Sequence, residues 1–169
     1  MLTVRAEAPE DRESVRRVNE AAFGRAGEAD LVEALRAGGR HSVSLVAEEA
    51  GRVVGHILFS PLTVESGAGE WVAQGLGPMA VVPGRQRRGV GSLLVREGLR
   101  SCARLGHEVV FVLGHADYYP RFGFRAAARE GLACEFPAPE ECFMVAELRP
   151  GALAGRKGLV RYAPEFKNV

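Results

Sequence analysis

The pattern of hydrophobic and polar positions changes period several times along the chain and predicts mixed α and β structure. Near the N-terminus, strand-like alternation gives way to apolar positions three and four residues apart, which predict helices beginning near Pro9 and Glu28. Three β-rich runs follow, and the link Glu49-Ala50-Gly51 between the first two is typical of a hairpin. The strands expected in this half are residues 2–6, 42–48, 52–64 and 71–82.

The second half begins with a helical pattern over residues 89–105 and continues with strands. The buried stripe expected on this helix consists of Val90, Leu94, Cys102 and Leu105. Gly98 falls on the same stripe, where the missing side chain would let the helix approach a sheet closely. Residues 108–113 are nearly all apolar, as expected for a strand covered on both faces. Further strands are expected to begin at Gly123 and to span 143–148, before a tail rich in glycine and proline.

The composition is that of an ordinary globular chain and excludes some classes of partner. The 169 residues are 47% hydrophobic and 25% charged, and no interdomain linker or repeat interrupts them. A net charge of +1 argues against a general binder of nucleic acids or membrane surfaces. The chain has no apolar run of about 18 residues and no signal-peptide pattern, so we expect a cytoplasmic protein. The three cysteines lack metal-ligand spacing and are interpreted as free thiols, with no metal site.

The junction between residues 79 and 92 carries the most specific chemistry. A strand ending at Pro83 leads into a loop that contains Gly89 and Gly91 and opens a helix. The first turn of a helix presents free N–H groups and partial positive charge, and glycine lets this backbone approach a phosphate. Arg87 and Arg88 add positive charge at the same place. We therefore predict an anion site that fits a pyrophosphate.

Two other phosphate motifs fit this segment less well. A P-loop would have a lysine followed by serine or threonine after its last glycine, whereas Gly91 is followed by Ser92 and Leu93. A dinucleotide fingerprint would have a small residue in place of Leu94 and an acidic residue on the next strand, and 108–113 ends in apolar residues. A tight turn without a ligand would not require the accompanying arginines.

These residues carry a resemblance to a known family. The run Met79-Ala80-Val81-Val82-Pro83-Gly84-Arg85-Gln86-Arg87-Arg88-Gly89-Val90-Gly91 resembles the acetyl-CoA motif of GNAT-family N-acetyltransferases, with Met79 in place of a commoner leucine. Residues 119–124, Tyr-Pro-Arg-Phe-Gly-Phe, are similar to the family's Tyr-x-x-x-Gly-Phe. Leu76-Gly77-Pro78 and Pro150-Gly151-Ala152-Leu153 further resemble the YhbS-like branch. The sequence departs from that branch at 115–117, which reads His-Ala-Asp.

The resemblance implies an α+β fold, an α/β sandwich with a mixed, mostly antiparallel sheet of roughly six to seven strands and about four helices. It implies one N-acetyltransferase domain over 1–169, with 150–169 as a C-terminal extension, and acetyl-CoA as cosubstrate. The implied arm-binding residues on the splayed sheet are Met79, Ala80 and Val81. The implied pyrophosphate-binding residues are Gln86, Arg87, Arg88, Gly89, Val90, Gly91 and Ser92. We also expect a bulge at Gly77-Pro78, because proline cannot donate to a β-ladder.

Acetyl transfer to an amine needs an acid that protonates the leaving thiolate. The resemblance places this acid at Tyr119, and a tyrosine hydroxyl with an ordinary pKa near 10 can donate to a thiolate. Its neighbour Tyr118 is the alternative, because a shift of one position would exchange the two. His115 is a candidate proton relay beside them.

The base that deprotonates the amine is left open by the sequence. The glutamate that many family members carry on the fourth strand is absent, and Gln74 is the long polar side chain there. His56 lies in an apolar strand and is interpreted as a core residue. An amine that is already neutral, or a chain of waters, would need no side-chain base.

The sequence thus predicts transfer of acetyl from acetyl-CoA to a primary amine of a small molecule or peptide. The alternative hypothesis is a catalytically silent acyl-CoA-binding sensor or partner module, and a weaker one is nucleic-acid binding through Arg85, Arg87 and Arg88. We expect neither a nucleic-acid nor a membrane partner, while the tail leaves a homodimer possible. Phe23, Phe59 and Trp71 are compatible with either a pocket wall or plain core.

Overall fold

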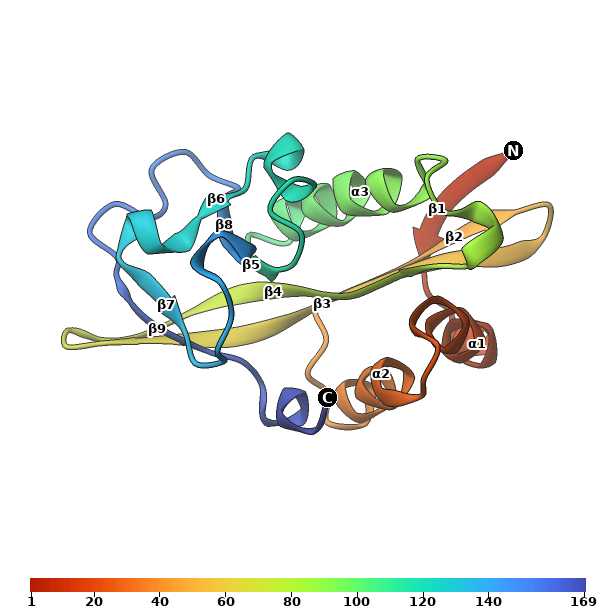
Figure 1. Cartoon of the computed structure of the whole chain (residues 1–169), viewed down its shortest axis with the longest axis horizontal. Coiled ribbons are helices and arrows are strands. Elements are labelled where there is room, and N and C mark those ends of the chain that lie inside the picture. Colours follow the sequence, from red (N-terminus) through yellow and green to blue (C-terminus); the bar gives the residue numbers. More distant parts are fainter.

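The computed structural model describes residues 1–169 and contains one nine-stranded sheet with three α-helices (Figure 1). The strands are β1 (Leu2–Ala6), β2 (Val43–Glu49), β3 (Arg52–Ser66), β4 (Gly69–Val81), β5 (Val109–Leu113), β6 (Arg125–Ala126), β7 (Leu132–Cys134), β8 (Phe143–Glu147) and β9 (Gly158–Arg161). The α-helices are α1 (Arg12–Phe23), α2 (Gly27–Ala37) and α3 (Val90–Arg104). Short 3-10 turns include η3 (Tyr119–Phe122) and η6 (Pro164–Asn168).

The sheet is mixed and mostly antiparallel, as predicted. Its main path runs β1-β2-β3-β4-β5-β8-β6, and β9 pairs with both β3 and β7. Only the β4–β5 and β7–β9 pairs are parallel. The sheet exceeds the expected six to seven strands by β7, whose three residues are too few for a hydrophobic period, and by β9, which lies in the glycine- and proline-rich tail. The helix count is three rather than about four, because the extra turns are 3-10 helices of three to five residues.

Helices cover both faces of the sheet (Figure 1). The helix α3 packs on one face through Val90, Leu94 and Cys102, as its apolar stripe predicts. The prediction that Leu105 belongs to this buried stripe is wrong, since Leu105 is 61% exposed. The helix ends at Arg104, so Leu105 is a cap residue that no longer follows the helical face. Against the opposite face pack α1 and α2, and the C-terminal turn η6 lies beside α2.

The close approach of α3 to the sheet depends on Gly98. A Cβ built at Gly98 would lie 2.3 Å from Cε1 of Phe59, a fully buried ring on β3. Glycine is therefore required here by contact rather than by backbone conformation, and Phe59 belongs to the core. Trp71 likewise packs against the buried ring of Phe111.

An irregularity in β4 opens the sheet where the chemistry was expected. The register against β3 shifts between Ile57↔Met79 and Phe59↔Leu76, which places one additional residue on β4 at Gly77-Pro78. The expected bulge is confirmed. On its other edge β4 pairs with β5 only from Gln74 to Leu76, so the strands separate beyond Leu76.

The predicted hairpin and tail can also be located. Ala50 and Gly51 both have positive φ (51° and 76°) in the tight β2–β3 link, the backbone that two-residue hairpin turns require. The tail, which shows no pattern in sequence, contributes β9 to the sheet and η6 beside α2. No helix is long and apolar enough to span a membrane.

Candidate active site

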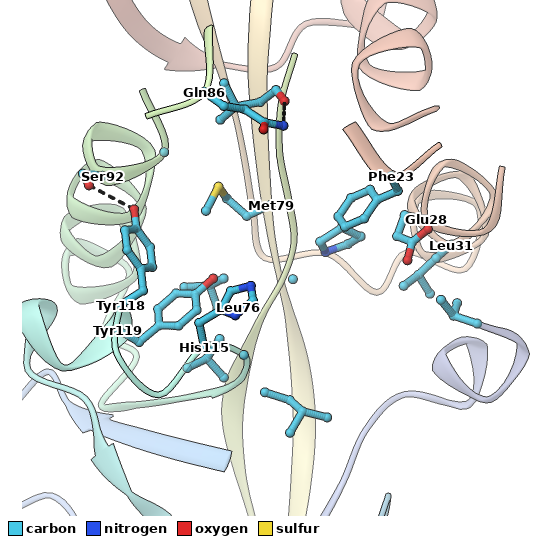
Figure 2. Close-up of a pocket in the computed structure, with 18 of the residues that line it drawn as sticks. Phe23, Glu28, Leu31, Leu76, Met79, Gln86, Ser92, His115, Tyr118 and Tyr119 are labelled. Carbon is cyan, nitrogen blue, oxygen red and sulfur yellow. Dashed lines mark hydrogen bonds between the residues drawn. The ribbon is translucent and has the colours of Figure 1, made fainter. Parts of the chain in front are cut away.

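A cavity of about 1230 Å³ lies where β4 and β5 separate (Figure 2). One wall consists of the first turn of α3 and the loop after β5. The opposite wall consists of the α1–α2 junction and C-terminal residues, and β4 runs between the two walls. Figure 2 shows Tyr118, Tyr119, His115 and Ser92 on one side of β4, and Phe23 and its neighbours on the other.

The first turn of α3 offers its backbone to the cavity. The first intrahelical bond runs from the Leu93 N–H to the Gly89 carbonyl, which leaves earlier N–H groups of the turn without an intrahelical acceptor. Gly89 caps the helix with φ 85°, a left-handed conformation that favours glycine. A Cβ at Gly91 would meet the Met79 side chain at 3.3 Å, so this position too is kept free of a side chain. The arrangement suits an anion held by backbone N–H groups.

The loop before α3 places its polar side chains in different directions. Gln86 donates from Nε2 to the Val81 carbonyl at 2.9 Å and so ties the loop to the end of β4. Arg87 lines the cavity, whereas the exposed Arg88 does not. Arg85 pairs with Glu49 of the β2–β3 hairpin at 2.5 Å. One guanidinium therefore accompanies the first turn of α3 inside the cavity.

The three predicted arm-binding residues of β4 do not all expose side chains there. Met79 and Val81 line the cavity, while the Ala80 side chain is buried against the opposite face with α1 and α2. This alternation is the ordinary pleat of a strand, so at Ala80 only the backbone remains available to a ligand. Val90 of the helix is likewise buried, beneath the sheet-facing side of α3.

The hydroxyls of the two adjacent tyrosines point in different directions (Figure 2). The Tyr118 Oη lies 3.0 Å from the Ser92 Oγ on α3, and the Arg121 guanidinium stacks 4.6 Å from the Tyr118 ring centre. The Tyr119 hydroxyl points toward the middle of the cavity and has no hydrogen-bond partner in the protein. Tyr119 is thus the tyrosine whose hydroxyl is free for a ligand.

The Tyr119 ring is held tightly. A Cβ at Gly114 would lie 2.6 Å from the ring, and Phe124 packs against it edge to face at 5.7 Å. Burial, with a smaller effect of Tyr118, raises the pKa of Tyr119 to about 12. The hydroxyl therefore keeps its proton across the physiological range.

His115 anchors the turn that holds both tyrosines. Its carbonyl accepts hydrogen bonds from the N–H groups of Tyr118 (3.1 Å) and Tyr119 (3.3 Å). The side chain is exposed and lines the cavity next to Tyr119 and Leu76. The His-Ala-Asp segment thus still forms a tight turn that brings His115 beside the tyrosines.

Comparison with known proteins decides the family. Residues 3–127 match the model of the acetyltransferase (GNAT) domain, which is most of the chain. The chain belongs to the GNAT acetyltransferase family. The resemblance seen in the sequence is confirmed, and so is the enzyme class of N-acetyltransferases.

Several relatives of this GNAT acetyltransferase cover nearly its whole length. The N-acetyltransferase YhbS of Escherichia coli strain K12 is 37% identical over 168 residues, covering 99% of each chain. The crystal structure of E. coli YhbS in complex with CoA superimposes with a TM-score of 0.93 at 35% identity, over 98% of this chain and 92% of YhbS. A Brucella melitensis GNAT acetyltransferase in complex with acetyl-CoA gives a TM-score of 0.82 at 36% identity, over 98% of each chain.

Neither of the two polar strand residues noted in the sequence, His56 and Gln74, reaches the cavity of this acetyltransferase. His56 is fully buried on the α1 side of β3, where it contacts Ser44 and Asn19, so it is a core residue as interpreted. Gln74 is also buried and faces His107, with Nε2 3.3 Å from Nδ1. The strands therefore supply no carboxylate or imidazole beside Tyr119.

The sequence reading missed most of the second wall of this acetyltransferase. Of the aromatic residues it considered, Phe23 lines the cavity, and Glu28 and Leu31 follow it on α2. Arg25 lies between them, and further residues come from the C-terminal part of the chain: Phe136, Tyr162, Phe166 and Val169. Phe136 lies 26 positions before Tyr162, and the three residues near the C-terminus sit in no motif, so a local pattern could not group them with Phe23 and Glu28.

Proposed function

We propose that this protein transfers an acetyl group from acetyl-CoA to a primary amine. The observation that carries the proposal is the free Tyr119 hydroxyl, which points into the same cavity as the first turn of α3. An anion site and an acid within one cavity are the two elements that a thioester donor with a pyrophosphate requires. The complexes of two full-length relatives with CoA and acetyl-CoA support the choice of donor.

The residues present fit this donor. Residues 86–92 would hold the pyrophosphate through the backbone of the first turn of α3 and the Arg87 guanidinium. Residues 79–81 would hold the pantetheine arm along the edge of β4 that no longer pairs with β5. The glycine at position 91 supports this placement, because a Cβ there would lie 3.3 Å from the side chain of Met79, which lines the same cavity. The same proposal treats 1–169 as one N-acetyltransferase domain to which 150–169 adds β9 and part of the cavity wall.

Tyr119 would act as the general acid. Acetyl-CoA supplies an activated acetyl thioester. As the amine nitrogen bonds to the acetyl carbon and the carbon–sulfur bond breaks, the Tyr119 hydroxyl gives its proton to the leaving sulfur. The proton lost by the amine then restores the hydroxyl, and exposed His115 is placed to relay it. Tyr118, whose hydroxyl is engaged with Ser92, would position the α3 wall instead.

The proposal is tested by incubating the protein with acetyl-CoA and a panel of primary amines and measuring the release of the free thiol of CoA. Tyr119→Phe should lower kcat by about 100-fold, since it removes a proton donor. The same variant should bind acetyl-CoA as tightly as the parent protein in calorimetry. If Tyr118→Phe lowers kcat more than Tyr119→Phe does, Tyr118 is the general acid and Tyr119 is not.

The main rival is a silent acyl-CoA-binding module, motivated by the absence of a strand carboxylate near Tyr119. It predicts saturable binding of acetyl-CoA without turnover for any amine on the panel. Absence of acetyl-CoA binding at millimolar concentration would reject both functions.

A further inference from the structure

The wall opposite α3 has a composition that suggests which amine it receives. Phe136, Tyr162 and Phe166 form a continuous aromatic row, with ring centres 5.7 and 5.1 Å apart. They come from the loop after β7, the residue after β9 and the turn η6. Three separate segments therefore present ring surface to one side of the cavity.

A second apolar edge comes from the α1–α2 junction. Phe23, the last residue of α1, leaves 40% of its surface exposed although it lines a cavity, and Leu31 follows on α2. Figure 2 shows both across β4 from Tyr119. Ring surface left open in a concave site is typical of a pocket that receives an apolar group.

Among these apolar groups lies one carboxylate. Glu28 is at the second position of α2, and its side chain is 10% exposed. Arg25 binds it through two nitrogens, at 3.0 and 2.5 Å, which lowers the pKa of Glu28 and keeps it ionised. A carboxylate accepts about four hydrogen bonds, so Glu28 retains capacity for an ammonium or amine N–H. Held ionised in this way, it is an anchor rather than a base.

The charges of the whole cavity limit the number of cationic groups that an acceptor can carry. Its acidic lining residues are Glu28 and Asp117, and Asp117 lies on the other wall, in the loop after β5. The same cavity is lined by Arg25, Arg87 and Arg121. On the wall opposite α3, Glu28 is the lining carboxylate and Arg25 already pairs with it, so the further ammonium groups of a polyamine or aminoglycoside would find no carboxylate there.

We propose that the acceptor is a primary monoamine carrying an aromatic or branched apolar group, with Glu28 holding the amine and the aromatic row holding the apolar group. This inference rests on the proposed acetyl transfer and names its acceptor class. Glu28 is the residue that sets specificity for the amine, and Phe23 contributes to specificity for the apolar group. The amine would bind first at Glu28 and then move across β4 to Tyr119, from the side that the pyrophosphate site leaves open.

The experiment compares kcat/KM for phenethylamine, ethanolamine, spermidine, kanamycin and phenylalanine at fixed acetyl-CoA. Phenethylamine should exceed each of the others by at least about tenfold, because only it combines a ring with a single charge. Phe23→Ala should raise KM for phenethylamine and leave KM for ethanolamine unchanged. A preference for spermidine or kanamycin, or for phenylalanine with its added carboxylate, would overturn the proposal.

Variants of α2 test the anchor. Glu28→Gln should raise KM for phenethylamine about tenfold while KM for acetyl-CoA stays the same. The matched control is Glu33→Gln, on the same helix but paired with Arg16 outside the cavity. Equal KM values for phenethylamine in Glu28→Gln and the parent protein would show that Glu28 does not bind the amine. Thermal melting and acetyl-CoA binding show whether each variant is folded.

Calorimetric titration of phenethylamine into the protein with CoA separates this inference from the proposed function. Saturable binding without turnover would reject acetyl transfer but retain the amine pocket. Turnover of other amines without phenethylamine binding would reject the pocket assignment and retain acetyl transfer. If phenethylamine does not bind and no amine is acetylated, both the amine pocket and acetyl transfer are rejected.

Discussion

A buried histidine beneath α1 predicts that the fold is sensitive to mild acid. The His56 Nδ1 lies 3.3 Å from the Asn19 amide nitrogen, which can only donate, so these partners assign the ring proton to Nε2. That nitrogen lies 2.9 Å from the Ser44 Oγ, which in turn donates to Glu7 at 2.6 Å. A second proton on Nδ1 would face the Asn19 N–H groups, so this arrangement favours the neutral ring.

The loss of stability in acid follows from the pKa of His56 in the native state and in the unfolded chain. Burial, with a smaller contribution from the charge of Arg36, lowers the pKa of His56 to about 3, against about 6.5 in an unfolded chain. Below pH 6.5 His56 takes up a proton in the unfolded chain but not in the native state. The contribution of His56 to the free energy of unfolding is therefore fully present above pH 6.5. It falls as the pH drops from 6.5 toward 3. Between pH 7.5 and 5.5 the loss is about 1.4 kcal/mol.

Urea unfolding at pH 7.5 and 5.5 measures this loss. His56→Gln replaces the ring by an amide that cannot titrate, so its free energy of unfolding should depend on pH by about 1.4 kcal/mol less than that of the parent protein. His41→Gln, at an exposed position, is the matched control and should keep the parent's dependence. The same pH dependence for His56→Gln and the parent would refute the reasoning, whatever the absolute stability of the variant.

Three further predictions concern packing, a hydrogen bond and a thiol. Gly98→Ala should destabilise the protein by about 1–3 kcal/mol in urea unfolding despite the better helix propensity of alanine, because its Cβ would overlap Phe59; an unchanged midpoint would contradict the contact. Tyr118→Phe should lower the free energy of unfolding by about 1 kcal/mol through loss of the bond to Ser92, measured in the same way. Burial raises the pKa of the Cys102 thiol to about 12, so alkylation at pH 8 followed by mass spectrometry should label it only after unfolding.

The strand, loop and helix of the proposed pyrophosphate segment could be predicted because all its parts are neighbours in sequence. Strand, glycines, arginines and helix occur within residues 79–92, and each has a local physical meaning. The structure adds the orientations of the side chains, which the sequence does not contain. Gln86 is tied to β4, Arg87 lines the cavity and Arg88 does not, although all three belong to the same motif.

The acceptor wall could not be predicted because it exists only after long-range pairing. β9 aligns with Val64 and its neighbours on β3, which brings Tyr162 next to strand residues some hundred positions earlier. Phe23 and Glu28 belong to ordinary helical segments and Phe166 to a tail without a pattern, and nothing local separates a pocket aromatic from a core aromatic. For the same reason β9 was hidden in a tail that reads as irregular.

The bulge in β4 explains how these two walls serve one reaction. Because the additional residue at Gly77-Pro78 follows the last residue paired with β5, one edge of β4 is released while the other stays bonded to β3. The released part, Met79 to Val81, then runs between α3 on one side and the α1–α2 junction on the other. In the proposed reaction, donor and acceptor would meet across this strand. The α3 wall and the α1–α2 junction pack into separate clusters on opposite faces of the sheet, so substitutions on the proposed amine side would leave the packing of the α3 turn intact.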